Sequence, residues 1–239
     1  MKQTRLAYLL PNLFTASSIF VGFLSVAEAS RGHVAQAAWL ILLALVFDGL
    51  DGRIARLTHT ASRFGMEFDS LADVVSFGMA PAALLYLYVG YAYGKFGVLV
   101  SGLYVIFGAI RLARFNITSA QSEPNVFIGL PIPVAAVSVA SSVLFFDAHG
   151  LEQYGGVLLV LALPLGLLMV SNIRYPSFKT LPLDRPIVYK ALVALTLSAS
   201  LLYLYSTEGV ALIVATYILY GPLRATLALR RFAHRKRTD

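Results

Sequence analysis

Four aspartates between residues 48 and 73 have the spacing that points most directly to chemistry. Asp48 and Asp51 form one pair, and Asp69 and Asp73 form a second. Residues three or four apart share one face of an α-helix, and the connector between the pairs suits a helical hairpin, so the pairs can face each other. Carboxylates this close repel one another unless a cation holds them, and hard oxygen ligands suit Mg²⁺, Mn²⁺ or Ca²⁺.

Glycines and arginines are interspersed with these aspartates. Gly52 and Gly65 leave room for a bulky ligand to approach the backbone, and Arg56 can pair with a phosphate. A divalent metal with a guanidinium beside several carboxylates is the equipment of phosphoryl transfer. The metal neutralises phosphate charge, and one carboxylate can act as a base.

The composition places these residues in a membrane protein. The 239 residues are 58% hydrophobic and only 13% charged, whereas soluble domains are nearer half apolar and a quarter charged. The absence of cysteine excludes disulfides and thiolate metal sites. Acidic residues within membrane helices are costly and mark functional sites by default.

Apolar segments of membrane length, about 20 residues, recur along the whole chain. They predict an all-α fold, namely a polytopic membrane helical bundle of about eight transmembrane helices in a single domain, 1–239. The predicted spans are 11–29, 34–52, 68–89, 97–117, 127–146, 155–172, 187–205 and 209–227. The last span is the weakest, because Arg224 must snorkel or mark its end.

The basic residues predict how these spans are oriented. If the N-terminus is cytoplasmic, the opposite connections contain only two of the 19 Lys and Arg residues, Arg31 and Lys95. This positive-inside pattern places both termini and all four aspartates on the cytoplasmic side. It also accounts for the formal charge of +7 without a nucleic-acid partner. The basic tail from Arg230 to Arg237 is expected to contact anionic lipid or to act as a plain topology anchor.

Two competing interpretations concern the first span and the aspartates. Ala27-Glu28-Ala29 after a basic and apolar stretch resembles a signal-peptide cleavage site, although we favour retention of the span. The aspartates could instead line the ion path of a cation transporter. A transporter would place acids near the bilayer midplane on several helices, whereas these four cluster at one edge on two helices.

The full spacing D-x2-D-G-x2-A-R-x8-G-x3-D-x3-D, from Asp48 to Asp73, resembles the signature of the CDP-alcohol phosphatidyltransferases. The resemblance implies transfer of a phosphatidyl or related group from a CDP-linked donor to an alcohol, with release of CMP. It implies a site for two divalent cations, Mg²⁺ or Mn²⁺, held mainly by Asp48, Asp51 and Asp69. Asp73 would be the general base and can also contact a metal.

The same resemblance assigns residues to the nucleotide part of the donor. Gly52, Arg56 and Gly65 would lie along the CDP moiety, together with Asp48 and Asp69. It also puts the segment containing Asn12 and Thr15 beside the nucleotide. From the residues alone, Pro11 can equally open the first helix, with Asn12 or Thr15 as a cap.

Three further segments at predicted cytoplasmic ends bear on the acceptor alcohol. They begin at Arg111, Gly129 and Ser171, and the set resembles the bacterial and archaeal phosphatidylserine synthases of the family over about residues 10–180. The predicted spans within 187–227 are additional. The candidate serine-binding residues are Arg111, Arg114, Asn172 and Arg174.

Serine would bring a carboxylate that Arg174 can bind bidentately, with a hydrogen bond from Asn172. The arginines could equally be positive-inside residues at lipid headgroups, or serve an acceptor such as glycerol phosphate or inositol phosphate. The resemblance favours CDP-diacylglycerol and L-serine as substrates. It also implies a homodimer. The compact form and the lack of an obvious targeting extension suit a prokaryotic plasma or inner membrane, with membrane lipids as partners.

Overall fold

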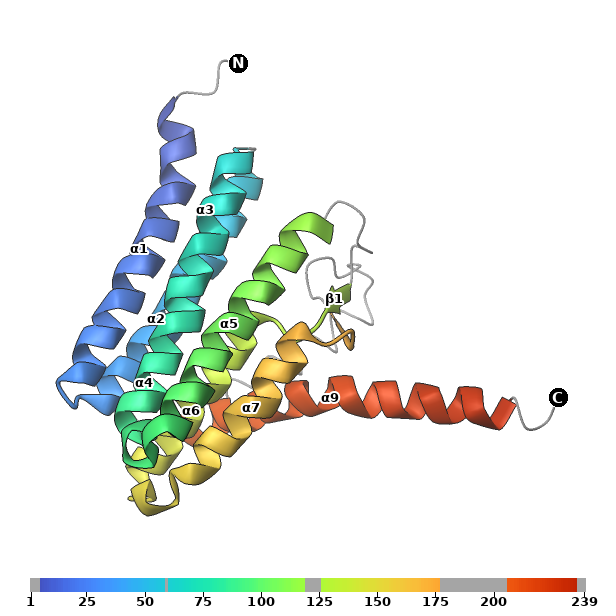
Figure 1. Ribbon diagram of the computed structural model, residues 1–239. Helices are drawn as coiled ribbons and strands as arrows, with labels where there is room; N and C mark the ends of the chain where they lie inside the picture. Colours follow the sequence, from blue (N-terminus) through green and yellow to red (C-terminus); the bar gives the residue numbers. More distant parts are fainter. Residues whose placement is uncertain (1–4, 59, 119–125, 177–205, 236–239) are drawn as a thin grey trace.

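The computed structural model describes residues 5–58, 60–118, 126–176 and 206–235, which are mostly helical (Figure 1). The α-helices are α1 (Arg5–Ser30), α2 (Val34–Leu57), α3 (Arg63–Asp73), α4 (Ala80–Tyr88), α5 (Gly94–Thr118), α6 (Ile132–Ala148), α7 (Gly156–Val170) and α9 (Ser206–Arg235). A π-helical segment, η1 (Val74–Met79), joins α3 to α4. Short 3₁₀ turns precede α5 and α7, and two strands, β1 (Val126–Ile128) and β2 (Arg174–Pro176), complete the described chain.

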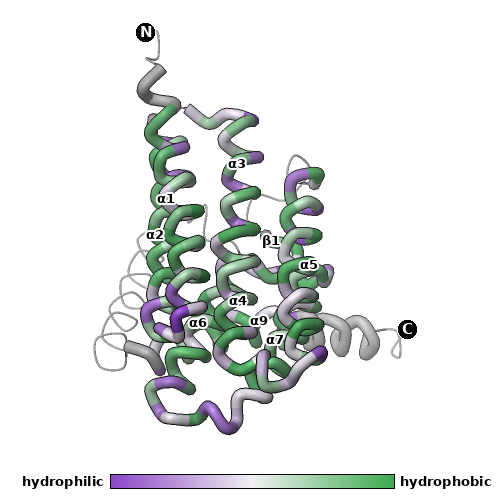
Figure 2. Tube along the Cα trace, turned by 60° about the vertical axis from the view of Figure 1, so that its left-hand side comes forward, coloured by the Kyte–Doolittle hydropathy of each residue, from purple (hydrophilic) through white to green (hydrophobic). Residues whose placement is uncertain are grey.

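Four helical segments are long and apolar enough to cross a membrane, namely Leu9–Ser30, Val34–Leu57, Arg63–Tyr88 and Gly90–Thr118. Two shorter apolar helices, Ile132–Ala148 and Gly156–Val170, follow. In Figure 2 these helices are apolar along most of their length, and polar residues gather at connections and on α3. The predicted span 187–205 lies outside the described residues, as does the end of the basic tail. The predicted span 209–227 falls within α9.

Short connections make α1 antiparallel to α2 and α6 antiparallel to α7, whereas α3 continues through η1 into α4 in one direction. The α1–α2, α4–α5 and α6–α7 connections lie at the lower end of the bundle in Figure 1. The α2–α3 connection, the end of α5 and the strands lie toward the other end. This alternation brings the end of α2 and the start of α3, which contain the four aspartates, to the same end of the bundle.

Small residues let the first helices approach closely, as in many membrane helix contacts. Ala37, Ala38 and Ala44 of α2 are fully buried. Large apolar side chains on the outside, among them Phe20, Phe23 and Val160, are more than half exposed. Apolar side chains on both the inner and outer surfaces are what a helix bundle surrounded by lipid requires.

The first helix begins earlier than expected. Pro11 lies inside α1, which starts at Arg5, so the expectation that Pro11 opens the first helix is wrong. The preceding residues are mostly good helix formers, and a proline in an apolar helix is tolerated when side chains compensate for the disturbed backbone bonds. The Thr15 hydroxyl lies 3.2 Å from the Pro11 carbonyl oxygen.

A π-helical turn directly follows Asp73. The backbone N–H of Ala80 donates to the carbonyl of Val75, five residues earlier. The buried Ser76 in this turn donates to the backbone carbonyl of Ser18 on α1 over 2.9 Å. Single π turns within α-helices often occur at functional sites, and this one fixes the end of α3 against α1.

The predicted span 127–146 is wrong at its start. Val126–Ile128 form β1, which pairs antiparallel with β2 and places Phe127 opposite Tyr175. The helix begins only at Ile132, because Pro131 adopts an extended conformation as its N-cap and Gly129 has a positive φ of 78°. A short strand paired with a distant segment leaves little local signal in an apolar sequence.

Candidate active site

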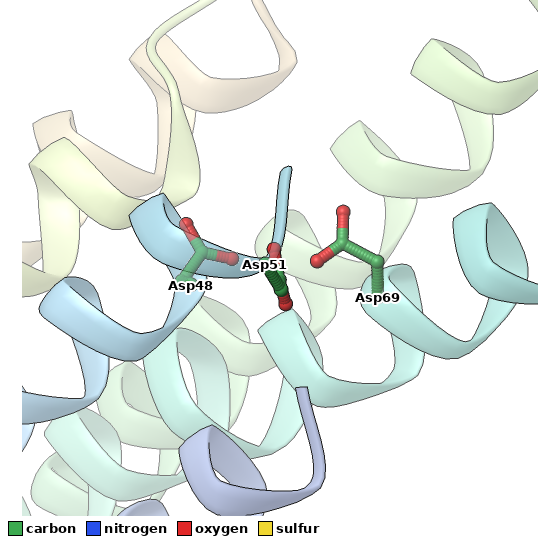
Figure 3. Close-up of side chains that lie close together, drawn as sticks. All are labelled: Asp48, Asp51 and Asp69. Carbon is green, nitrogen blue, oxygen red and sulfur yellow. The ribbon is translucent and has the colours of Figure 1, made fainter. Parts of the chain in front are cut away.

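The carboxylates of Asp48, Asp51 and Asp69 converge at the contact between α2 and α3 (Figure 3). One oxygen from each lies within 4.8 Å of the others. Asp51 is buried, and Asp48 and Asp69 are partly buried. Spacings of three residues on α2 and four on α3 turn the acidic side chains toward the same space, as predicted from helical periodicity.

Asp73 lies one turn beyond Asp69 and ends α3. It is only 8% exposed, and its Oδ1 has no hydrogen-bond partner among the described residues. Asp48 and Asp69 are close enough to act on it electrostatically. A buried carboxylate oxygen without a donor is costly, so this atom is available to accept a hydrogen bond or a proton from a ligand.

Helix α1 contributes directly to this cluster. The hydroxyl of Thr15 is 2.6 Å from Asp51 Oδ2, and both residues are buried. The hydroxyl donates to one carboxylate oxygen and so helps to orient a carboxylate of the acidic cluster. The first span therefore contributes a side chain to the carboxylate cluster.

Asn12 lies beside the start of α3. A Cβ on Gly65 would be 3.6 Å from Asn12 Oδ1 and 3.2 Å from Ser62 Oγ. Ser62 is the N-cap of α3, and its hydroxyl accepts from the backbone N–H of Gly65 over 3.0 Å. The N-terminal end of a helix favours anions, so Asn12, Gly65 and the first turn of α3 present a polar, positively polarised surface.

Gly52 and Arg56 occupy the last two turns of α2. A Cβ on Gly52 would be 3.6 Å from Arg56 Nη1, so the guanidinium lies over the glycine. Arg56 is exposed, whereas Gly52 is partly buried. This exposed cation lies five residues after Asp51 on the same helix and is close enough to interact with it electrostatically, so a phosphate could reach both.

Arg111 of α5 faces the acidic cluster from the opposite side. It is 6% exposed, interacts electrostatically with Asp73, and its Nε has no hydrogen-bond partner among the described residues. Its guanidinium carbon is 5.4 Å from the centre of the Phe115 ring. The Phe115 ring thus restricts the orientation of a buried guanidinium that lies near Asp73.

Arg114, one turn later, has a different environment. Its guanidinium donates to the backbone carbonyls of Val170 and Ser171, each over 2.9 Å, and to that of Ile128 over 3.2 Å. It therefore caps the C-terminus of α7, where backbone carbonyls lack helical partners. Its Nη1 is also 3.3 Å from Asn172 Oδ1, so two of the candidate acceptor residues contact each other.

Arg174 lies in β2, opposite Ile128 of β1, and both it and Asn172 are exposed. The adjacent Tyr175 is fully buried. The ribbon thus turns Arg174 outward while Tyr175 is anchored inward, as alternation along a strand requires.

Three polar residues that join α3 to α5, namely Glu67, Ser70 and Asn116, were not predicted to belong to the site. Asn116 Nδ2 donates to Ser70 Oγ over 3.0 Å and to Glu67 Oε2 over 3.2 Å. Asn116 ends the segment that begins at Arg111, but neither Ser70 nor Glu67 belongs to any recognised spacing. These bonds fix α5 against the helix that contains Asp69 and Asp73.

The donor set fits a divalent cation. Asp48, Asp51 and Asp69 offer only carboxylate oxygens, and the buried Asp73 oxygen could add another. Hard cations such as Mg²⁺ and Mn²⁺ prefer such ligands, and a cation would relieve the repulsion among the carboxylates. An oxygen-rich metal site between Arg56 and Arg111 is suited to a substrate that contains a pyrophosphate.

The chain is similar to known proteins of one family. The family model for CDP-alcohol phosphatidyltransferase matches residues 8–168. A CDP-diacylglycerol–serine O-phosphatidyltransferase of Helicobacter pylori strain J99 is 50% identical over 223 residues, which is 91% of each chain.

Two more distant relatives match about 70% of the chain. An archaetidylserine synthase of Methanothermobacter thermautotrophicus is 39% identical over 70% of this chain and 69% of its own. A CDP-diacylglycerol–serine O-phosphatidyltransferase of Bacillus subtilis is 34% identical over 71% of this chain and 91% of its own. The carboxylate cluster, its fit to a metal and these matches lead to one conclusion: the chain belongs to the CDP-alcohol phosphatidyltransferase family.

Proposed function

We propose that this protein transfers the phosphatidyl group of CDP-diacylglycerol to the hydroxyl of L-serine, giving phosphatidylserine and CMP. The observation that carries the chemistry is the convergence of three carboxylates beside a fourth, buried one. The relatives named as serine O-phosphatidyltransferases, one of them 50% identical over 91% of both chains, support serine as the acceptor.

The residues divide into donor and metal groups. Asp48, Asp51 and Asp69 would hold Mg²⁺ or Mn²⁺, with Asp73 as a further ligand where two ions bind. When bound, the metal would neutralise the pyrophosphate of the donor and stabilise the departing CMP. Asn12, Thr15, Gly52, Arg56 and Gly65 would line the nucleotide, with Arg56 paired to phosphate.

Asp73 is our candidate for the general base. Its unpartnered Oδ1 would accept the proton of the serine hydroxyl, while the serine oxygen bonds to the lipid-linked phosphorus. The bond from that phosphorus to the CMP oxygen then breaks. Burial of Asp73 excludes water, which would otherwise compete with serine as the nucleophile.

Arg111 is the best placed of the four acceptor candidates. Its buried guanidinium has an unused Nε donor and faces Asp73, so a serine bound to Arg111 through its carboxylate would present its hydroxyl to Asp73. Arg114 would support this site indirectly through its cap on α7, and the exposed Asn172 and Arg174 would line its entrance.

The topology and assembly also belong to this proposal. We infer about eight spans in one domain, 1–239, with both termini and the site at the cytoplasmic face of the plasma or inner membrane. The asymmetry of Lys and Arg supports the orientation, and the family match over residues 8–168 supports a core within about 10–180. A homodimer follows from the family resemblance, and cross-linking in native membranes tests it.

Purified protein in lipid nanodiscs, supplied with labelled CDP-diacylglycerol, Mg²⁺ or Mn²⁺ and a panel of alcohols, tests the function. We expect CMP release and labelled phosphatidylserine with L-serine. CMP release only with glycerol phosphate or inositol phosphate would replace serine with another acceptor. No CMP release with any acceptor would overturn the transferase assignment, and an Asp69→Asn variant provides the background rate.

A further inference from the structure

Tyr175 anchors the β-ribbon to α9. Its side chain is fully buried, and its ring stacks on that of Tyr217 with 5.5 Å between the ring centres and 28° between the planes. Its hydroxyl donates to the backbone carbonyl of Ile218 over 3.3 Å. A buried tyrosine with its hydroxyl satisfied is a rigid anchor, because both its ring and its polar end have partners.

Gly221 makes this contact possible. A Cβ at Gly221 would lie 2.4 Å from Tyr175 Cζ and 2.5 Å from Cε1. These distances are far below van der Waals contact, so any larger residue would push the ring away. The glycine lies one turn after Tyr217 on α9, and the two residues together form the seat of the Tyr175 ring.

From this seat, a line of aromatic side chains continues to the reaction centre. Tyr175 pairs with Phe127 across the ribbon, and the Phe127 ring centre is 6.4 Å from that of Phe115. Phe115 packs under the guanidinium of Arg111, and Tyr217 is itself close enough to Arg111 for an electrostatic interaction. The orientation of Arg111 therefore depends on packing that begins at α9.

This helix lies beyond the part of the chain that defines the family. The family match ends at residue 168, and the Bacillus subtilis relative matches with 91% of its own length but only 71% of this chain. Figure 1 shows α9 lying across the bundle, where it packs against α6 and β2. Helix α9 thus reaches the part of the site near Arg111, where we place the acceptor. The four aspartates, by contrast, all lie within the residues that match the family, 8–168.

We propose that α9 is a positioning element for the acceptor: Gly221 and Tyr217 seat Tyr175, and this seat holds the ribbon and Phe115 so that Arg111 points at the serine carboxylate. Neither residue touches the reacting atoms. The inference rests on the proposed function, because its effect is measured as the transfer of the phosphatidyl group to serine. It assigns a role in that reaction to α9, which lies outside the residues that match the family.

The test is Gly221→Ala in the full-length protein, assayed in nanodiscs. We expect the KM for serine to rise by about tenfold, with the KM for CDP-diacylglycerol unchanged, because only the acceptor side is displaced. The matched control is Gly102→Ala on α5, where a Cβ meets no atom within 4 Å. A uniform loss of kcat and stability without a selective change for serine would overturn the inference.

A double variant separates positioning from general damage. Tyr175→Leu removes the ring atoms that a new Cβ would strike, so Gly221→Ala should add little in a Tyr175→Leu background. Equal effects of Gly221→Ala in the wild-type and Tyr175→Leu backgrounds would overturn the proposed coupling between Gly221 and Tyr175.

If Gly221→Ala does not accumulate in membranes, Tyr217→Leu replaces it, and we again expect the KM for serine to rise. A wild-type KM for serine in Tyr217→Leu would overturn the inference. Failure of the proposed function is distinct, because the wild type itself would then lack serine-dependent CMP release.

Discussion

The hydroxyl of Thr15 donates a hydrogen bond to Asp51 Oδ2 over 2.6 Å, and this contact joins α1 to the carboxylate cluster on α2 and α3. The Pro11 carbonyl is also 3.2 Å from this hydroxyl, but a hydroxyl has one proton and the shorter contact is to the carboxylate. The bond therefore orients the Asp51 carboxylate, which belongs to the acidic cluster. Loss of a side chain that orients a metal ligand typically lowers metal affinity by about 10- to 100-fold.

Replacing Thr15 with valine should weaken metal binding while keeping the packing volume. We expect an apparent affinity for Mg²⁺ or Mn²⁺ lower by about 10- to 100-fold, measured from activity against metal concentration and from Mn²⁺ titration calorimetry. Thr15→Ser keeps the donor and should stay close to the wild type. An unchanged metal dependence in Thr15→Val would show that Asp51 is oriented without α1.

Replacing Asp73 with asparagine should remove transfer and spare donor binding. An amide has nearly the same shape but cannot accept the serine proton, so we expect kcat to fall by roughly 10²- to 10⁴-fold. Binding of CDP-diacylglycerol, followed by thermal stabilisation, should be retained. Asp147→Asn, at the opposite end of the bundle, is the matched control. Near-normal turnover of Asp73→Asn would assign the base to another group.

Replacing Arg111 with lysine should affect serine more than the donor. Lysine keeps the charge but loses the planar fork and the contact with Phe115, so we expect kcat/KM for serine to fall by roughly 10- to 100-fold. The KM for CDP-diacylglycerol should change little. Arg31→Lys, whose arginine pairs with Glu28 at the lower end of the bundle, is the control. Equal losses for both substrates would place Arg111 at the donor instead.

The acidic centre was predictable because its signal is local. Spacings of three and four residues fix which side chains share a helix face, and the short connection between the helices fixes that α2 and α3 meet. Asp48, Asp51 and Asp69 therefore converge as the sequence indicates. Their partners were harder to foresee. Thr15 is 36 residues from Asp51, and nothing in its own sequence neighbourhood distinguishes a helix cap from a ligand support.

The acceptor side shows the opposite situation. Four candidate residues share a predicted face of the membrane, but which of them faces Asp73 depends on contacts among α5, α7 and the ribbon. The β1–β2 pairing joins residues almost 50 positions apart, and three-residue strands leave no usable periodicity. The different environments of Arg111 and Arg114, three residues apart on one helix, follow only from that tertiary packing.

Arg114 supplies the last prediction, because it looks like a second substrate arginine in the sequence but caps a helix in the structure. Its guanidinium holds carbonyls of α7 and that of Ile128, beside Gly129, where a Cβ would lie 2.3 Å from the Met169 carbonyl oxygen. Arg114→Ala would remove the donors to those carbonyls, of which the carbonyls of α7 are partly buried. We therefore expect a loss of about 2–3 kcal/mol in stability, measured by thermal unfolding in detergent.

The kinetic consequence of Arg114→Ala should differ from that of Arg111→Lys. Arg114 holds α7 and the ribbon in place and does not contact serine. The fraction of Arg114→Ala that remains folded should therefore show a lower kcat and a higher KM for both substrates. Arg114→Gln keeps donors for some of the carbonyls and should recover part of the stability. A stable Arg114→Ala protein with a defect confined to the KM for serine would instead make Arg114 a direct ligand of the acceptor.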